Sequence, residues 1–161
     1  MIMINSFRIL YSLFIYILIS IPFSSTFSQS IVSPSPEITP LQVVEIQLFA
    51  LQSNDPKSDL GILQTWEFAH PRNKNATGPY NRFAAMIRSP AYLILLNNKN
   101  FETKEISNDG TKSEVAVKID SKNNKFFAYL WTLEKISDES KLNGSWMTVG
   151  VSFPIELSNG L

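Results

Sequence analysis

Three polar side chains of this sequence are of types that could do chemistry, and each also has a purely structural interpretation. His70, the only histidine, precedes Pro71, where its imidazole could move a proton or cap the end of a helix. Glu45 could act as a carboxylate base or lie on a solvated helix face. Arg82 could clamp a carboxylate or phosphate group, or form an internal ion pair with Glu67 or Glu45. For each of these three residues the structural interpretation is simpler than the chemical one, so we assign no catalytic residue.

Aromatic side chains are numerous enough to line a small apolar pocket, although core packing also explains each of them. Trp66 and Tyr80 fall in the part of the chain with helical periodicity, near the polar candidates. If the protein binds a ligand, we expect these two rings and the three polar side chains to contact it. The candidate ligand-binding residues are therefore Glu45, Trp66, His70, Tyr80 and Arg82.

The composition excludes several other kinds of site. The 161 residues include no cysteine, which excludes disulfides, thiolate nucleophiles and zinc sites built on sulfur. One histidine cannot form a metal centre that needs several. The 14 basic side chains balance 14 acidic ones, which argues against nucleic acid as a partner. The sequence has no P-loop, dinucleotide fingerprint or metal-ligand spacing, so we expect no cofactor and no metal.

The chain begins with a hydrophobic leader. Arg8 is the only charged residue before Glu37, and residues 9–23 are apolar apart from two serines and a proline. As a helix this run would span roughly 22 Å at about 1.5 Å per residue, short of the roughly 30 Å hydrocarbon core. Small residues follow, with cleavage expected after Ser28 or Ser30. We therefore expect a signal peptide over 1–28 and export to a periplasm, the extracellular space or an internal lumen; an uncleaved membrane anchor over 9–23 is the alternative.

A single domain follows the leader, because 44% apolar and 17% charged residues suffice for one core. Residues 29–38 are a Ser/Pro-rich linker, 39–154 the domain and 155–161 a polar tail. Thr39, Pro40 and Gln42 predict a capped helix that runs to about Gln52. A turn at 54–56 caps a second helix up to 70, residues 73–75 are loop, and a third helix opens at 77–79 with Thr77 as its cap.

From Ala91 onward the periodicity is that of strands. Strands are expected over 92–96, 101–106, 114–119, 125–136 and 146–153, separated by turns such as Asn108-Asp109-Gly110. Three helices followed by an antiparallel meander predict an α+β fold. The strand over 125–136 is apolar on both faces, and helices can cover only one of them, so we expect a second copy or another protein to cover the other. The candidate interface residues are Phe127, Tyr129 and Trp131.

Part of the sequence resembles the domain-of-unknown-function 4864 family. The resemblance covers roughly residues 40–153, is densest over 61–92, and includes Gly61-Ile62, Phe68-Ala69, Thr77-Gly78-Pro79 and Arg82-Phe83. That family is similar to the nuclear-transport-factor-2-like superfamily, which implies a cone with helices packed into a curved antiparallel sheet. Enzymes of that superfamily hold an aspartate or histidine base and a tyrosine-like acid inside the cone, and no such set maps onto this sequence. The resemblance therefore implies a fold and leaves the activity open.

Three functional hypotheses follow. The first is a non-catalytic exported binding or assembly module, dimeric through its sheet, with a small apolar cavity; its partners are a second copy, a small apolar ligand or another protein. The second is a small cofactor-free acid–base isomerase or dehydratase acting on an apolar ligand, which requires a buried titratable group such as Glu45 or His70. The third is a lipid-facing factor held at a membrane by its uncleaved leader.

Overall fold

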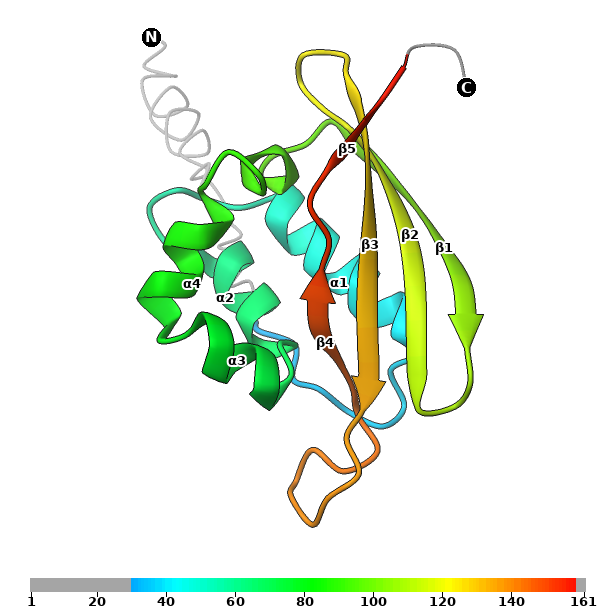
Figure 1. Cartoon of the computed structure of the whole chain (residues 1–161). Coiled ribbons are helices and arrows are strands. Elements are labelled where there is room, and N and C mark those ends of the chain that lie inside the picture. Colours follow the sequence, from blue (N-terminus) through cyan, green and yellow to red (C-terminus); the bar gives the residue numbers. More distant parts are fainter. Residues whose placement is uncertain (1–29, 159–161) are drawn as a thin grey trace, which may run out of the picture.

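The computed structural model describes residues 30–158, and the predicted leader over 1–28 lies outside this range. Four α-helices precede an antiparallel sheet of five strands (Figure 1), which confirms the α+β class and gives one α-helix more than expected. None of the helices between residues 30 and 158 has the length and apolar character needed to cross a membrane. The helices are α1 (Pro40–Gln52), α2 (Leu60–Glu67), α3 (Pro71–Thr77), α4 (Tyr80–Ile87) and the short 3-10 helix η1 (Leu93–Leu95).

Helix α1 begins as its sequence predicts. The hydroxyl of Thr39 accepts a hydrogen bond from the backbone N–H of Gln42, whose side-chain oxygen accepts one from the backbone N–H of Thr39. Pro40 occupies the first helical position, where its missing N–H costs no hydrogen bond. Seven residues of α1 are buried, so the helix is held by packing as well as by its cap.

Helix α2 starts later than the turn at 54–56 predicts. The side-chain oxygen of Asn54 reaches forward and accepts hydrogen bonds from the backbone N–H groups of Gly61 (3.0 Å) and Ile62 (3.3 Å). This residue therefore supplies a cap across a seven-residue connection, while Asp59 at the N-cap position makes no capping bond with its side chain. The predicted cap is real, but it serves a helix that begins at Leu60.

Two local predictions are wrong. Residues 73–75 are part of α3 instead of a loop; this helix has no buried residue, so the sequence carries no amphipathic pattern that would reveal it. The strand expected over 92–96 is the 3-10 helix η1 at Leu93–Leu95, because a short apolar run does not distinguish a strand from a buried helical turn. Leu95 of this turn packs into the core.

The start of α4 is also corrected. Thr77 closes α3, where its hydroxyl donates to the carbonyl of Asn73 at 2.8 Å, instead of capping the following helix. Helix α4 begins after Pro79, which makes no side-chain capping bond. Pro79 is the residue before the first helical position, and its backbone is extended (φ −68°, ψ 173°).

The sheet has the order β1-β2-β3-β4, with β5 also paired to β3. The last two strands share one edge of β3: β4 pairs with its C-terminal half and β5 with its N-terminal residues. The expected tail at 155–161 therefore contributes a short strand to the sheet. The strands are β1 (Asn100–Asn108), β2 (Lys112–Asp120), β3 (Phe126–Lys135), β4 (Trp146–Val151) and β5 (Ile155–Leu157).

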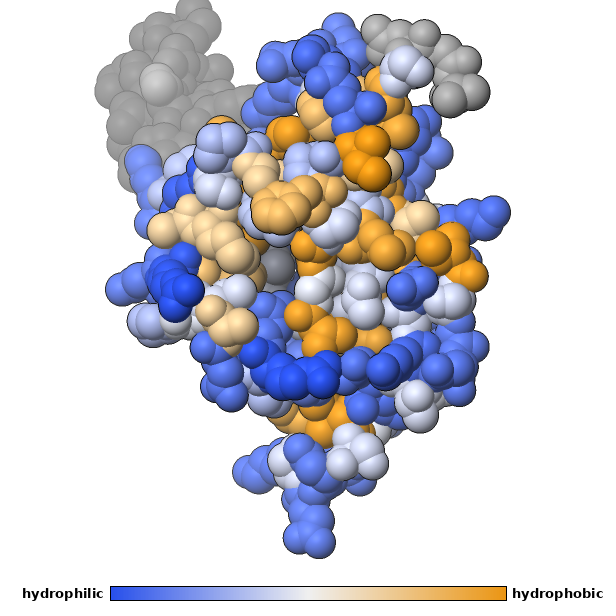
Figure 2. All heavy atoms as spheres, in the orientation of Figure 1, coloured by the Kyte–Doolittle hydropathy of each residue, from blue (hydrophilic) through white to orange (hydrophobic). Residues whose placement is uncertain are grey.

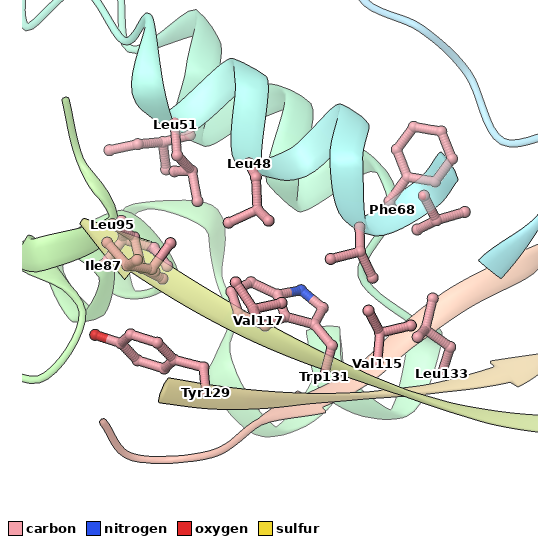
Figure 3. Packing of buried hydrophobic residues seen from close by; sticks show 14 of the residues in the cluster. Leu48, Leu51, Phe68, Ile87, Leu95, Val115, Val117, Tyr129, Trp131 and Leu133 are labelled. Carbon is pink, nitrogen blue, oxygen red and sulfur yellow. The ribbon is translucent and has the colours of Figure 1, made fainter. Parts of the chain in front are cut away.

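Helix α1 covers one face of the sheet, with α2, α3 and α4 beyond the edge that β4 forms (Figure 1). Trp131 stands on this covered face beneath α1 (Figure 3), and its side chain is 1% exposed. Tyr129 is buried beside it, and Phe127 packs against the same core. The interface predicted at these three aromatic residues is therefore corrected: they belong to the face that the helices cover. The opposite face carries Phe126, Ala128 and Leu130.

The segment before α1, predicted to be a linker, is attached to the domain. The backbone N–H of Val32 donates to the side-chain oxygen of Gln64 (2.7 Å), and the amide nitrogen of Gln64 donates back to the carbonyl of Val32 (2.8 Å). Ile38 packs against the core. Residues 30–38 therefore lie along the helical layer at these points.

Candidate functional site

A cavity of about 300 Å³ lies between the helices and the β4 edge of the sheet. Figure 2 shows a hollow in the molecular surface at this place, between α4 and β4. The cavity is roughly twice the size of one that holds a benzene ring, and lies at the lower end of the range for small-molecule sites. The lining is mostly apolar and consists of Gln47, Leu51, Thr65, Ala69, Arg72, Asn73, Ala76, Thr77, Phe83, Met86, Ile87, Tyr92, Leu95, Trp131, Thr148, Val149, Gly150 and Val151.

A buried amide forms the polar part of the lining. Gln47 is 1% exposed, and its Oε1 accepts hydrogen bonds from Trp131 Nε1 (3.1 Å) and Thr148 Oγ1 (2.8 Å). Its Nε2 donates to the carbonyl oxygen of Thr65 at 3.0 Å. A buried amide is tolerated only when its hydrogen bonds are made, so this network fixes α1, α2, β3 and β4 relative to one another around the cavity.

One wall of the cavity is formed by β4, whose free edge is hydrogen-bonded to the segment between α2 and α3. The backbone N–H of Thr148 donates to the carbonyl of Phe68, and its carbonyl accepts from the N–H of His70, both at 2.8 Å. Asn73 Nδ2 donates to the same carbonyl at 3.2 Å. These bonds satisfy the backbone at one point of an otherwise open sheet edge and leave the next residues of β4 to line the cavity.

Two ionisable side chains belong to the cavity lining, those of Arg72 and Tyr92. The Tyr92 hydroxyl donates to the carbonyl of Val151 at 3.1 Å, and burial raises the pKa of this phenol, so it stays protonated at neutral pH. The side chain of Arg72 is 64% exposed, which places it at the mouth. Its Nη2 donates to Glu134 Oε2 at 2.6 Å.

The two predicted acid–base candidates lie outside this cavity. Glu45 accepts a hydrogen bond from the Thr103 hydroxyl at 3.1 Å and lines a separate shallow pocket on the outer side of α1. His70 caps α3, with Nδ1 accepting from the backbone N–H of Arg72 at 3.0 Å. It therefore caps the beginning of a helix and not, as the sequence suggests, the end of one. Burial and the nearby Arg72 charge lower the pKa of His70 below 6.5.

The other three candidates also lie away from the cavity lining. Trp66 packs against Tyr80 and Phe83, with ring centroids 6.1 and 5.0 Å apart, and Lys74 Nζ lies 5.4 Å from its ring. Arg82 is exposed on α4. The ion pairs that link arginines in the described part of the chain are Arg88 with Asp59 and Arg72 with Glu134, so the predicted pair between Arg82 and Glu67 or Glu45 is corrected.

Sequence reasoning did not identify the polar residues of the cavity. Gln47 lies four residues after Val43 and four before Leu51, on the buried side of α1, and a polar residue in an apolar stripe is the signal that could have found it. Thr148 and Arg72 have no such local signal.

The described residues contain no group of histidine, aspartate and glutamate side chains that could hold a metal ion. Comparisons with known protein families, with curated proteins and with solved structures find no match to this chain. The cavity itself therefore carries any functional argument.

Proposed function

We propose that this protein is a non-catalytic binding module that takes a small, mainly apolar molecule into the cavity beside β4. The observation that supports it is a cavity of about 300 Å³ with apolar walls, held open by the hydrogen-bonded Gln47. Apolar surface gains free energy when it leaves water, roughly 25 cal/mol per Å² buried. A ligand with an apolar body would gain this free energy without any rearrangement of the charged surface.

The cavity lining also favours binding over proton transfer. An acid–base mechanism needs a base within hydrogen-bond reach of the ligand, and neither Glu45 nor His70 lines the cavity. Burial raises the pKa of the Tyr92 phenol, so it stays protonated at neutral pH, and a guanidinium such as that of Arg72 only donates hydrogen bonds. The isomerase or dehydratase hypothesis would therefore need a base supplied from elsewhere.

We also propose, as the sequence resemblance suggests, that the chain is related to the domain-of-unknown-function 4864 family and through it to the nuclear-transport-factor-2-like superfamily. Helices that precede an antiparallel sheet and cover one of its faces support this relationship. The cavity between those helices and the sheet edge supports it as well.

The uncovered sheet face supports a dimer as the form of this module. Leu130 and Ala128 lie there, and the β5 partner of Ala128 is Ile155, which is 66% exposed. The ion pair between Lys118 and Glu102 (3.1 Å) lies beside this apolar stripe, because Lys118 stands opposite Ala128 in the register of β2 and β3. A face that pairs with itself needs charges of both signs, and this one has them, so we propose a second copy as its occupant.

A direct test is titration of the protein with 1-octanol, followed by NMR of the methyl groups of Leu51, Met86 and Ile87. All three line the cavity, so we expect their signals to shift together and to saturate. Saturation would also give the dissociation constant. Wild-type protein whose cavity methyl signals do not shift would contradict the proposal.

Two substitutions on α3 locate the binding. Ala76 is exposed and lines the cavity, whereas its neighbour Asn75 is exposed and does not. Ala76→Trp places a large ring at the mouth and should weaken 1-octanol binding by about tenfold or more. Asn75→Trp adds the same ring to the same helix and should leave the affinity unchanged. Equal affinities in the two variants would place the ligand elsewhere.

A further inference from the structure

The cavity has an apolar interior and a cationic mouth. Leu51, Ile87 and Leu95 lie among its walls, while the guanidinium of Arg72 is the charged group of the lining. We propose that the ligand is amphipathic, with an apolar body inside the cavity and an acidic head group, such as a carboxylate, that Arg72 binds at the mouth. This inference rests on the proposed function and adds the chemical class of the ligand.

The guanidinium of Arg72 has further N–H donors that could bind such a head group. It carries five N–H bonds in a planar fork that matches a carboxylate, and the hydrogen bond to Glu134 engages one nitrogen, Nη2. The side chain is 64% exposed, so its other donors are within reach of a molecule that enters from solvent. The short α3, capped by His70, fixes the backbone of Arg72 and hence the place of its side chain at the mouth.

The carboxylate of Glu134 does not neutralise the charge of Arg72 completely, because it also pairs with a second cation, Lys112. Lys112 Nζ lies 3.7 Å from Glu134 Oε1, and Arg72 Nη2 lies 2.6 Å from Oε2. The hydrogen bond from Arg72 lowers the pKa of Glu134, so this carboxylate stays charged at neutral pH and holds both cations. The cluster of Arg72, Lys112 and Glu134 therefore keeps one net positive charge, and Arg72 is its member at the mouth.

Lys112 is also a matched control for Arg72. Its side chain is 66% exposed against 64% for Arg72, and both are cations paired with Glu134. Of the two, only Arg72 lines the cavity. Arg72→Gln and Lys112→Gln thus remove the same charge from the same cluster, and only one of them removes the guanidinium at the mouth.

The experiment compares octanoate with 1-octanol, which share one apolar chain and differ in the head group. At about pH 7.5 octanoate is ionised. Dissociation constants for both are measured through the cavity methyl groups on wild-type protein and on the two variants. We expect Arg72→Gln to weaken octanoate relative to 1-octanol by about three- to tenfold, a range set by the partial exposure of the site. Lys112→Gln should change this ratio by less than about twofold, and Glu134→Gln should raise the affinity for octanoate.

The outcomes separate this inference from the function it rests on. An unchanged octanoate-to-octanol ratio in Arg72→Gln, with 1-octanol still bound in the cavity, overturns the acidic ligand and leaves the apolar binding site intact. An equal loss of octanoate affinity in Lys112→Gln also overturns it, because the effect would then come from overall charge and not from the mouth. Failure of both molecules to shift the cavity methyl signals of wild-type protein overturns the proposed function itself.

Discussion

At the scale of single residues, His70 should make stability depend on pH. Its Nδ1 accepts the hydrogen bond that caps α3, and only the neutral imidazole has the lone pair for it. Burial, followed by the Arg72 charge, lowers the pKa of His70 in the folded state below 6.5. A lowered pKa means that the contribution is complete above about pH 6.5, the value for the unfolded chain, and is lost as the pH falls through the lower folded value.

The substitution His70→Ala should therefore lower the free energy of unfolding by about 1 kcal/mol at about pH 7.5, the usual value of a helix cap. The difference from wild type should shrink toward about pH 5. Asparagine also accepts a capping bond but does not titrate, so His70→Asn should keep the stability at both pH values. Urea denaturation across this pH range measures the effect, and a difference that stays constant with pH would count against the capping role.

At the scale of elements, the crossing of α1 and α2 depends on Gly61. A Cβ atom at this position would lie 2.0 Å from the carbonyl oxygen of Ala50 and 2.9 Å from Asn54 Cβ. Backbone cannot move aside as a flexible side chain can, so Gly61→Ala should separate the two helices and cost about 2 kcal/mol or more in the free energy of unfolding. A Cβ at Gly150 in β4 meets nothing within 4 Å, and Gly150→Ala is the control that should be nearly neutral. Thermal unfolding of both variants tests this prediction. Equal melting temperatures would contradict the close contact between Gly61 and the backbone of α1.

The elements that the sequence predicts well are those whose signals are local. The cap of α1 at Thr39 lies within a few residues of the helix, and α1 is confirmed. The apolar alternation that predicts β2 is equally local, and β2 is confirmed at Val115, Val117 and Ile119. The sequence does not reveal α3, because this helix buries no side chain and so has no periodic pattern. The sequence does not reveal the 3-10 helix η1 either, because its form depends on where Leu95 packs, which a short apolar run does not specify.

At the scale of the whole molecule, the candidate site could not be predicted because its parts are far apart in the sequence. Gln47 and Thr148 are 101 residues apart, yet the hydrogen bond between them is 2.8 Å long. The mouth similarly joins Arg72 of α3 to Glu134 of β3. Periodicity showed which residues are buried, whereas the cavity arises where α1, α3 and β4 meet, and that depends on the packing of the complete chain.

The uncovered sheet face leads to the last prediction, which concerns the assembly of two copies. Leu130 lies at the centre of the apolar stripe, and a carboxylate there would be buried without a partner in a dimer. Leu130→Glu should therefore weaken self-association by about tenfold or more while the monomer stays folded, because the side chain is only half-buried on the face that no helix covers. Leu93→Glu makes the same change at an exposed position on η1, on the covered side of the sheet, so it is the matched control and should leave association unchanged. Sedimentation equilibrium gives the masses: a wild-type protein with the mass of one chain, or a Leu130→Glu variant that dimerises as strongly as wild type, would show that this face does not hold a second copy.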